Sequence, residues 1–146
     1  MEESALLGRV RWALAAILIF GLVGIEIELF LLKHTDGFWQ LLPVALVGAT
    51  VVIAVWAAVR PTPASLGIFR AAMGVFFVVG LVGVYQHFTG NVGYEKESNP
   101  GLAGAELYKL AAMGSTPVLA PGVMLQLGLI GLLYTYRHPA IIRKET

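Results

Sequence analysis

The stretch WALAAILIFGLVGIEIELFLL, Trp12–Leu32, decides the fold. It is apolar except for two carboxylates near its end, and it has the ~20 residues that an α-helix needs to cross the hydrocarbon core of a bilayer. Three similar stretches follow at 41–59, 66–88 and 118–136. The sequence therefore predicts an all-α polytopic membrane protein, a four-transmembrane-helix bundle that forms a single membrane domain over residues 1–146.

The composition excludes several classes of protein. Of the 146 residues, 58% are hydrophobic and 13% are charged, whereas an ordinary soluble domain has about 25% charged residues. The net charge of +1 is too small for nucleic-acid binding, and the absence of Cys excludes a disulfide framework. No nucleophile elbow, phosphate-binding glycine loop or zinc-protease motif is present, so an enzyme is the least favoured class.

Basic residues outside the predicted spans predict the orientation of the chain in the membrane. All six arginines fall on one side of the membrane, and the positive-inside rule places that side, with both termini, in the cytoplasm. The first stretch is too long for the core of a signal peptide, so we interpret it as a retained helix. The basic residues of the cytoplasmic side are Arg9, Arg11, Arg60, Arg70, Arg137, Arg143 and Lys144, and those of the outer side are Lys33, Lys96 and Lys109.

The predicted outer loop, residues 89–117, carries a helix signal. Asn99 suits the capping position, Pro100 suits the first helical position, and Gly114 suits the end. We therefore expect a short helix over about 100–113 that lies on the outer membrane surface. This helix covers the mouth of the bundle or docks a partner.

Two segments share a pattern that indicates an internal repeat. Gly21–Ile25 (GLVGI) aligns with Gly80–Val84 (GLVGV), and each lies in a helix predicted to run outward. Pro43 and Pro121 lie near the outer end of the next predicted helix in each half. The pattern predicts two tandem helical hairpins related by a pseudo-two-fold axis along the membrane normal. Chance similarity between apolar helices is the alternative.

The repeat aligns Glu28 with His87. Residues seven apart on a helix differ by about 20° and residues three apart by about 60°, so each of the two shares a face with two glycines. Small residues mark close approach between membrane helices, so we expect Glu28 and His87 to face the bundle interior near its outer side. The four glycines are Gly21, Gly24, Gly80 and Gly83, and His34, Tyr85 and Gln86 lie at a depth similar to that of the pair.

Three uses of the Glu28 and His87 pair stay open: a hydrogen bond that locks the two halves, a ligand or proton site open to the outside, and a divalent metal site. No other cofactor is predicted. Glu26 lies about 200° from Glu28, so it faces lipid near the headgroups or, as we favour, a second subunit. Gln126 is expected to hydrogen-bond to a neighbouring helix, with Thr50 as the candidate partner.

Four segments carry a resemblance: Thr116–Gly122 (TPVLAPG), Gln126–Leu129 (QLGL), Leu133–Pro139 (LYTYRHP) and Phe38–Pro43 (FWQLLP). Together they resemble stretches of small uncharacterised bacterial inner-membrane proteins of unknown function. The resemblance implies a four-span fold in the bacterial plasma membrane and carries no activity with it. The size and span number are also similar to those of the DoxX-like family, without a shared residue motif.

Two functions follow as hypotheses. The first is a small accessory or assembly protein that packs with itself, as a homo-oligomer, or with a larger membrane complex, because an outward carboxylate and glycine-rich faces need neighbours. The alternative is a transport or proton-linked binding protein with an outward-facing site on Glu28 and His87 at the repeat interface.

Overall fold

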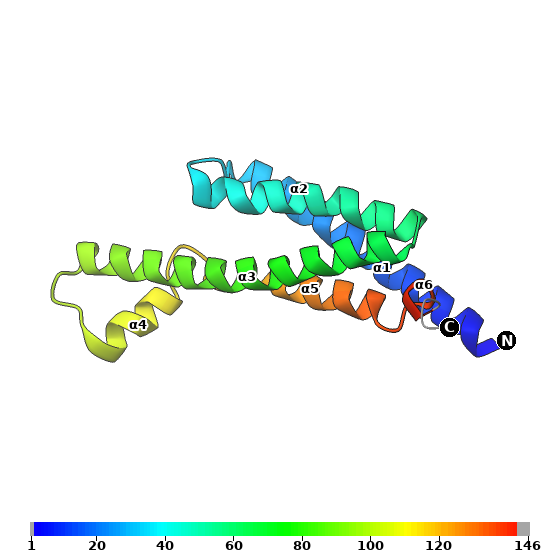
Figure 1. Cartoon of the computed structure of the whole chain (residues 1–146). Helices are drawn as coiled ribbons and strands as arrows, with labels where there is room; N and C mark the ends of the chain where they lie inside the picture. The colour runs from blue at the N-terminus through cyan, green and yellow to red at the C-terminus, as the bar shows by residue number, and fades with distance from the viewer. Residues whose placement is uncertain (1, 143–146) are drawn as a thin grey trace. The chain divides into compact units, whose positions relative to one another are not determined.

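The computed structural model describes residues 2–142, and helices make up most of this part of the chain (Figure 1). The prediction of an all-α chain is confirmed for the described residues. Arg143 and Lys144, which entered the prediction of orientation, lie outside them. The helices are α1 (Glu2–Leu31), α2 (Phe38–Val59), α3 (Pro63–Ser98), α4 (Gly104–Ala112), α5 (Gly122–Thr135) and α6 (Pro139–Ile142).

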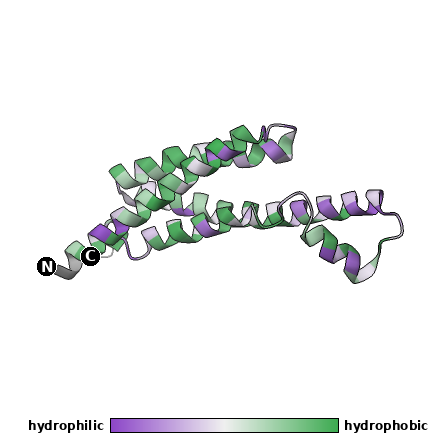
Figure 2. Cartoon of the chain, turned by 180° about the vertical axis from the view of Figure 1, so that it is seen from behind, coloured by the Kyte–Doolittle hydropathy of each residue, from purple (hydrophilic) through white to green (hydrophobic). Residues whose placement is uncertain are grey.

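Three of the described helices are long and apolar enough to cross a membrane. Their qualifying segments are Ala5–Leu31, Phe38–Val59 and Pro63–Ser98. Figure 2 shows hydrophobic residues along most of the length of these helices. The fourth predicted span contains α5, which is apolar but has only 14 residues. Three predicted spans therefore have a matching helix, and the fourth has a shorter one.

The described chain divides into two compact units. The first unit comprises the chain up to Phe76 and again from Leu127, so it holds α1, α2, the beginning of α3, the end of α5, and α6. In this unit α1 and α2 lie side by side (Figure 1). A Cβ on Gly131 of α5 would overlap Met73 and Phe69 of α3, so this glycine permits close packing of the two helices. The core side chains of the unit include Leu18, Leu22, Val47, Phe69 and Met73.

The second unit comprises Phe77–Gln126 and differs most from the prediction. Helix α3 continues to Ser98 instead of ending near residue 88, and α4 begins at Gly104 instead of near residue 100. Asn99 does not cap α4. Its backbone N–H donates to the carbonyl of Glu95 at 2.9 Å and its side-chain amide donates to the Glu95 carboxylate at 3.3 Å, so Asn99 closes α3 instead.

Helix α4 packs onto α3 through one face. Leu107 and Ala111 are buried, and the ring of Tyr108 stacks on that of Phe88 with 6.2 Å between centroids. Leu110 of α4 and Met113 at its end are exposed. The amphipathic pattern of α4 therefore places one narrow stripe against α3 and leaves apolar side chains outside it.

Candidate functional site

The two carboxylates of α1 take opposite environments. Glu26 is half-buried and faces α2, where a Cβ added to Gly48 would lie 3.2 Å from its Oε1 atom. The Oε2 atom of Glu26 is buried and has no hydrogen-bond partner. Glu28 is exposed. Within the first unit Glu26 therefore faces α2, where lipid or a second subunit was expected. The expectation that Glu28 faces the bundle interior stays a prediction, because His87 belongs to the second unit.

The helical geometry of α1 explains why Glu26 and Glu28 have different environments in the first unit. Leu22 is fully buried, and Glu26, four residues later, lies on nearly the same face of the helix. Glu28 lies about 200° from Glu26 and so falls on the opposite face. Because Gly48 has no side chain, α2 leaves room for the carboxyl group of Glu26.

The glycines of α1 also differ from one another. A Cβ on Gly21 would lie 2.8 Å from Cδ2 of Leu127, so α1 approaches α5 closely at this position. No atom from another helix lies within 4 Å of the corresponding position at Gly24, which is exposed, so the packing role of Gly24 stays a prediction. The angle of about 60° between the two glycines is enough to put one at the rim of the packed face and the other beyond it.

Gly24 and Glu28 belong to an exposed face that we call the outer stripe of α1. Its members recur at spacings of three and four residues, so they share one side of the helix. Phe20 is 82% exposed and Leu31 is 78% exposed, so the carboxylate of Glu28 lies among apolar side chains. The outer stripe consists of Phe20, Gly24, Ile27, Glu28 and Leu31.

His87 is half-buried on α3 and contacts the chain that precedes α5. Its Nδ1 atom lies 2.9 Å from the carbonyl oxygen of Pro117. Since a carbonyl oxygen only accepts, Nδ1 donates this hydrogen bond. Glu28 lies in the first unit and His87 in the second, and the pairing of the two stays a prediction.

Asn91 is a polar residue of α3 whose role the sequence reasoning missed. It is buried, and its side-chain amide donates to the carbonyls of Ala111 at 2.9 Å and Thr116 at 2.8 Å. Its Oδ1 atom accepts from the backbone N–H of Thr116 at 3.3 Å. Asn91 and His87 are four residues apart on one face of α3, so together they hold the end of α4 and the following loop. That spacing is the signal that was available in the sequence.

Gly80 and Gly83 of α3, the glycines of the second repeat segment, face the start of α5. A Cβ on Gly80 would lie 3.1 Å from the carbonyl oxygen of Pro121, and one on Gly83 would lie 2.7 Å from Cβ of Pro121. Both glycines therefore permit a close approach between α3 and the segment around Pro121. The aligned glycine pairs of the proposed repeat have different surroundings, so the internal repeat stays a prediction.

The remaining predicted site residues belong to both units, so their grouping around one site stays a prediction. Tyr85 is exposed, and its backbone carbonyl accepts from the hydroxyl of Thr89, as does that of the half-buried Gln86. His34 is half-buried in the turn after α1. Gln126 is exposed in the second unit, and the buried hydroxyl of Thr50 in the first unit has no hydrogen-bond partner among the described residues, so the predicted bond between the two stays a prediction.

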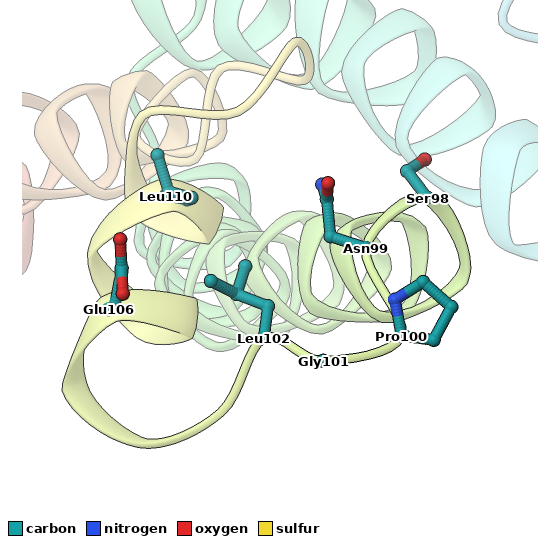
Figure 3. A pocket seen from close by; sticks show the side chains of 7 residues that line it. All are labelled: Ser98, Asn99, Pro100, Gly101, Leu102, Glu106 and Leu110. Carbon is teal, nitrogen blue, oxygen red and sulfur yellow. The ribbon is translucent and has the colours of Figure 1, made fainter.

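An open hollow lies between the end of α3 and α4 (Figure 3). It has a volume of about 520 Å³ and contains a single carboxylate, that of Glu106, beside the apolar side chains of Leu102 and Leu110. One exposed carboxylate in an open hollow does not by itself define a ligand site. Its lining residues are Ser98, Asn99, Pro100, Gly101, Leu102, Glu106 and Leu110.

We also searched the described side chains for a metal site and compared the chain with known proteins. Within the part of the chain that the structure describes, no group of three or more His, Asp or Glu side chains is arranged to hold a metal ion. The most informative features are therefore the two carboxylates of α1 and the polar pair of α3. In comparisons with known proteins, the chain matches no protein-family model, no curated protein and no solved structure.

Proposed function

We propose that the chain is a small integral membrane accessory or assembly protein, and that the outer stripe of α1 packs against a helix of a second copy or of a larger membrane complex. The exposed carboxylate of Glu28 carries this proposal. A carboxylate that faces lipid is costly, and a polar group on a neighbouring helix removes that cost. Gly24 lies one turn before Glu28 and has open space around it, so a neighbouring helix can approach the backbone of α1 there.

The proposed membrane arrangement has four spans with both termini in the cytoplasm. The fourth span would begin before α5, because successive i to i+3 hydrogen bonds continue the helical turns from Pro117 to Met124. In the resulting segment, residues 118–136, non-helical backbone at membrane depth is tolerated where protein covers it. The close approach of Gly80 and Gly83 to Pro121 supplies such cover.

A long α3 is consistent with the same arrangement. Its 36 residues span about 54 Å at 1.5 Å per residue, more than the roughly 30 Å hydrocarbon core. The last turns of α3 would therefore project beyond the bilayer, where Asn91 anchors the loop that follows α4. The resemblance to small bacterial inner-membrane proteins favours the bacterial plasma membrane as the location.

Native mass spectrometry after release in mild detergent tests the proposed docking face. We expect the wild-type protein to appear as a homo-oligomer or with a foreign subunit, and Gly24→Leu and Glu28→Leu to appear as monomers. Gly74→Leu is the matched control, because Gly74 lies exposed on α3 with no atom within 4 Å of its Cβ position. A monomeric wild-type protein, or the same stoichiometry in all four proteins, would refute the proposal.

A second candidate is proton-linked binding or transport centred on Glu26 instead of Glu28. The buried and unpartnered Oε2 atom of Glu26 favours it, since buried polar groups without partners are rare in structural roles. In this case Glu26→Gln abolishes a pH-dependent flux or binding signal in proteoliposomes and leaves the stoichiometry unchanged. Wild-type behaviour of Glu26→Gln in that assay eliminates the candidate.

A further inference from the structure

Five arginines gather at one end of the first unit. Three contacts bring the segments that carry them together: Arg11 Nη2 donates to the carbonyl of Arg137 at 3.2 Å, the hydroxyl of Tyr134 donates to the carbonyl of Ala57 at 3.4 Å, and the ring of Phe69 meets that of Tyr134 edge-on at 5.8 Å. These contacts join the beginning of α1, the end of α2, the beginning of α3 and the end of α5. The five are Arg9, Arg11, Arg60, Arg70 and Arg137.

Arg11 and Arg137 form the fixed part of this arginine end. Arg11 is half-buried, and its bond to the Arg137 carbonyl engages one of the five N–H donors of its guanidinium. The backbone of Arg137 has φ 46°, a left-handed conformation that non-glycine residues seldom adopt. Its guanidinium carbon lies 5.8 Å from the ring centroid of Tyr136. A strained turn thus holds two like-charged residues beside each other.

No described carboxylate neutralises this end. The described acidic side chains of the first unit are Glu26, Glu28 and Asp36, which belong to the other end of the α1–α2 hairpin. Glu2, Glu3 and Glu145 lie outside the described side chains. Burial lowers the pKa of His138, and the positive charge of Arg11 lowers it further, so this charge is felt by a neighbouring side chain.

We propose that the arginine end binds the phosphate of an anionic phospholipid headgroup, with Arg11 and Arg137 as its fixed donors. A planar guanidinium matches two phosphate oxygens at once, which an ammonium group does not. Exposed aromatic residues are close to these arginines in the sequence, as expected where helices leave the hydrocarbon core: Trp12 follows Arg11, Tyr136 precedes Arg137, and Trp56 precedes Arg60 by one turn. The acyl chains of a lipid pack against the apolar helices below the arginines, and a free phosphate ion lacks such chains.

The test uses the full-length protein in nanodiscs of equimolar phosphatidylglycerol and phosphatidylcholine, with retained lipids identified by native mass spectrometry. We expect the wild-type protein to retain phosphatidylglycerol preferentially, and the preference to fall about fivefold for each arginine removed in Arg11→Gln and Arg137→Gln. The matched control is Lys96→Gln with Lys109→Gln, which removes two exposed lysines of the second unit.

A second pair of variants separates lipid binding from misfolding. Arg60→Gln and Arg70→Gln change two exposed side chains at the periphery of the arginine end, and we expect them to lower the preference without changing the melting temperature in phosphatidylcholine alone. Equal retention of both lipids by the wild-type protein would overturn the proposal, as would an unchanged preference in every arginine variant. Displacement of phosphatidylglycerol by inorganic phosphate at constant ionic strength would also overturn it, in favour of a free-anion site. None of these outcomes depends on the outer stripe of α1.

Discussion

At the scale of single residues, His138 combines burial, a backbone hydrogen bond and a nearby charge. Its Nδ1 atom accepts from the N–H of Ala140 at 3.2 Å at the start of α6, so this nitrogen carries no proton. Burial lowers the pKa of His138 below its ordinary value of 6.5, and the charge of Arg11 lowers it further. As the pH falls below 6.5, the unfolded chain therefore takes up the proton before the folded one does.

We accordingly expect the protein to lose stability as the pH falls from 6.5 toward the lower pKa of the folded state, and to keep it above 6.5. Loss of a helix cap costs about 1 kcal/mol, which corresponds to a few degrees in melting temperature for a chain of this size. Melting curves in detergent across this range check the expectation. His138→Asn keeps a cap acceptor but does not titrate, so its curve should be flatter; parallel curves for the two proteins would contradict the assignment.

Single positions of α1 were the hardest to predict from the sequence. The spacing of Glu26 and Glu28 places them on opposite faces, and that part of the inference holds in the structure. Which face is covered depends on α2, where the absence of a side chain at Gly48 makes room for Glu26. One helix considered alone does not contain this information, because covered and open faces of a membrane helix are almost equally apolar.

At the scale of elements, the clamp formed by Asn91 holds the end of α4. Asn91→Ala leaves the carbonyls of Ala111 and Thr116 and the N–H of Thr116 without these partners, at a cost of at least about 1–3 kcal/mol. Hydrogen exchange in detergent should show faster exchange of the Thr116 amide. Asn99→Ala is the control, because Asn99 is exposed and bonds to Glu95. Unchanged exchange at Thr116 would show that the loop is held by other contacts.

The helices were predicted more reliably than their ends. Apolar length indicated α1, α2 and the membrane part of α3, because the hydrocarbon core demands about 20 apolar residues. The ends depend on polar residues that suit two roles, and Asn99 is the clearest example: the same side chain caps a following helix or closes a preceding one. Pro100 favoured the first role, because proline suits the first position of a helix. The structure shows the second role, because α3 extends to Ser98 and so brings Glu95 within hydrogen-bond distance of Asn99.

At the scale of the whole molecule, the membrane arrangement is the main prediction, and the absence of Cys makes it accessible to single-cysteine labelling. We expect Thr35→Cys and Ser98→Cys to react with a membrane-impermeant maleimide in intact spheroplasts, since both side chains are exposed in loops or helix ends on the proposed outer side. Pro61→Cys and Ile142→Cys should react only after permeabilisation, because the positive-inside rule predicts that the arginine-rich side faces the cytoplasm.

The label at Ile142 distinguishes four spans from three. If α5 and the hydrogen-bonded turns before it cross the bilayer, Ile142→Cys behaves like Pro61→Cys. If the 14 residues of α5 are too short to cross, Ile142→Cys reacts from the same side as Ser98→Cys. The second outcome would place Arg137 and the C-terminal end of α5 outside the cell, against the positive-inside rule. Their contacts with Arg11 and Ala57 join segments that would then lie on opposite sides of the membrane, which is why we expect the four-span result.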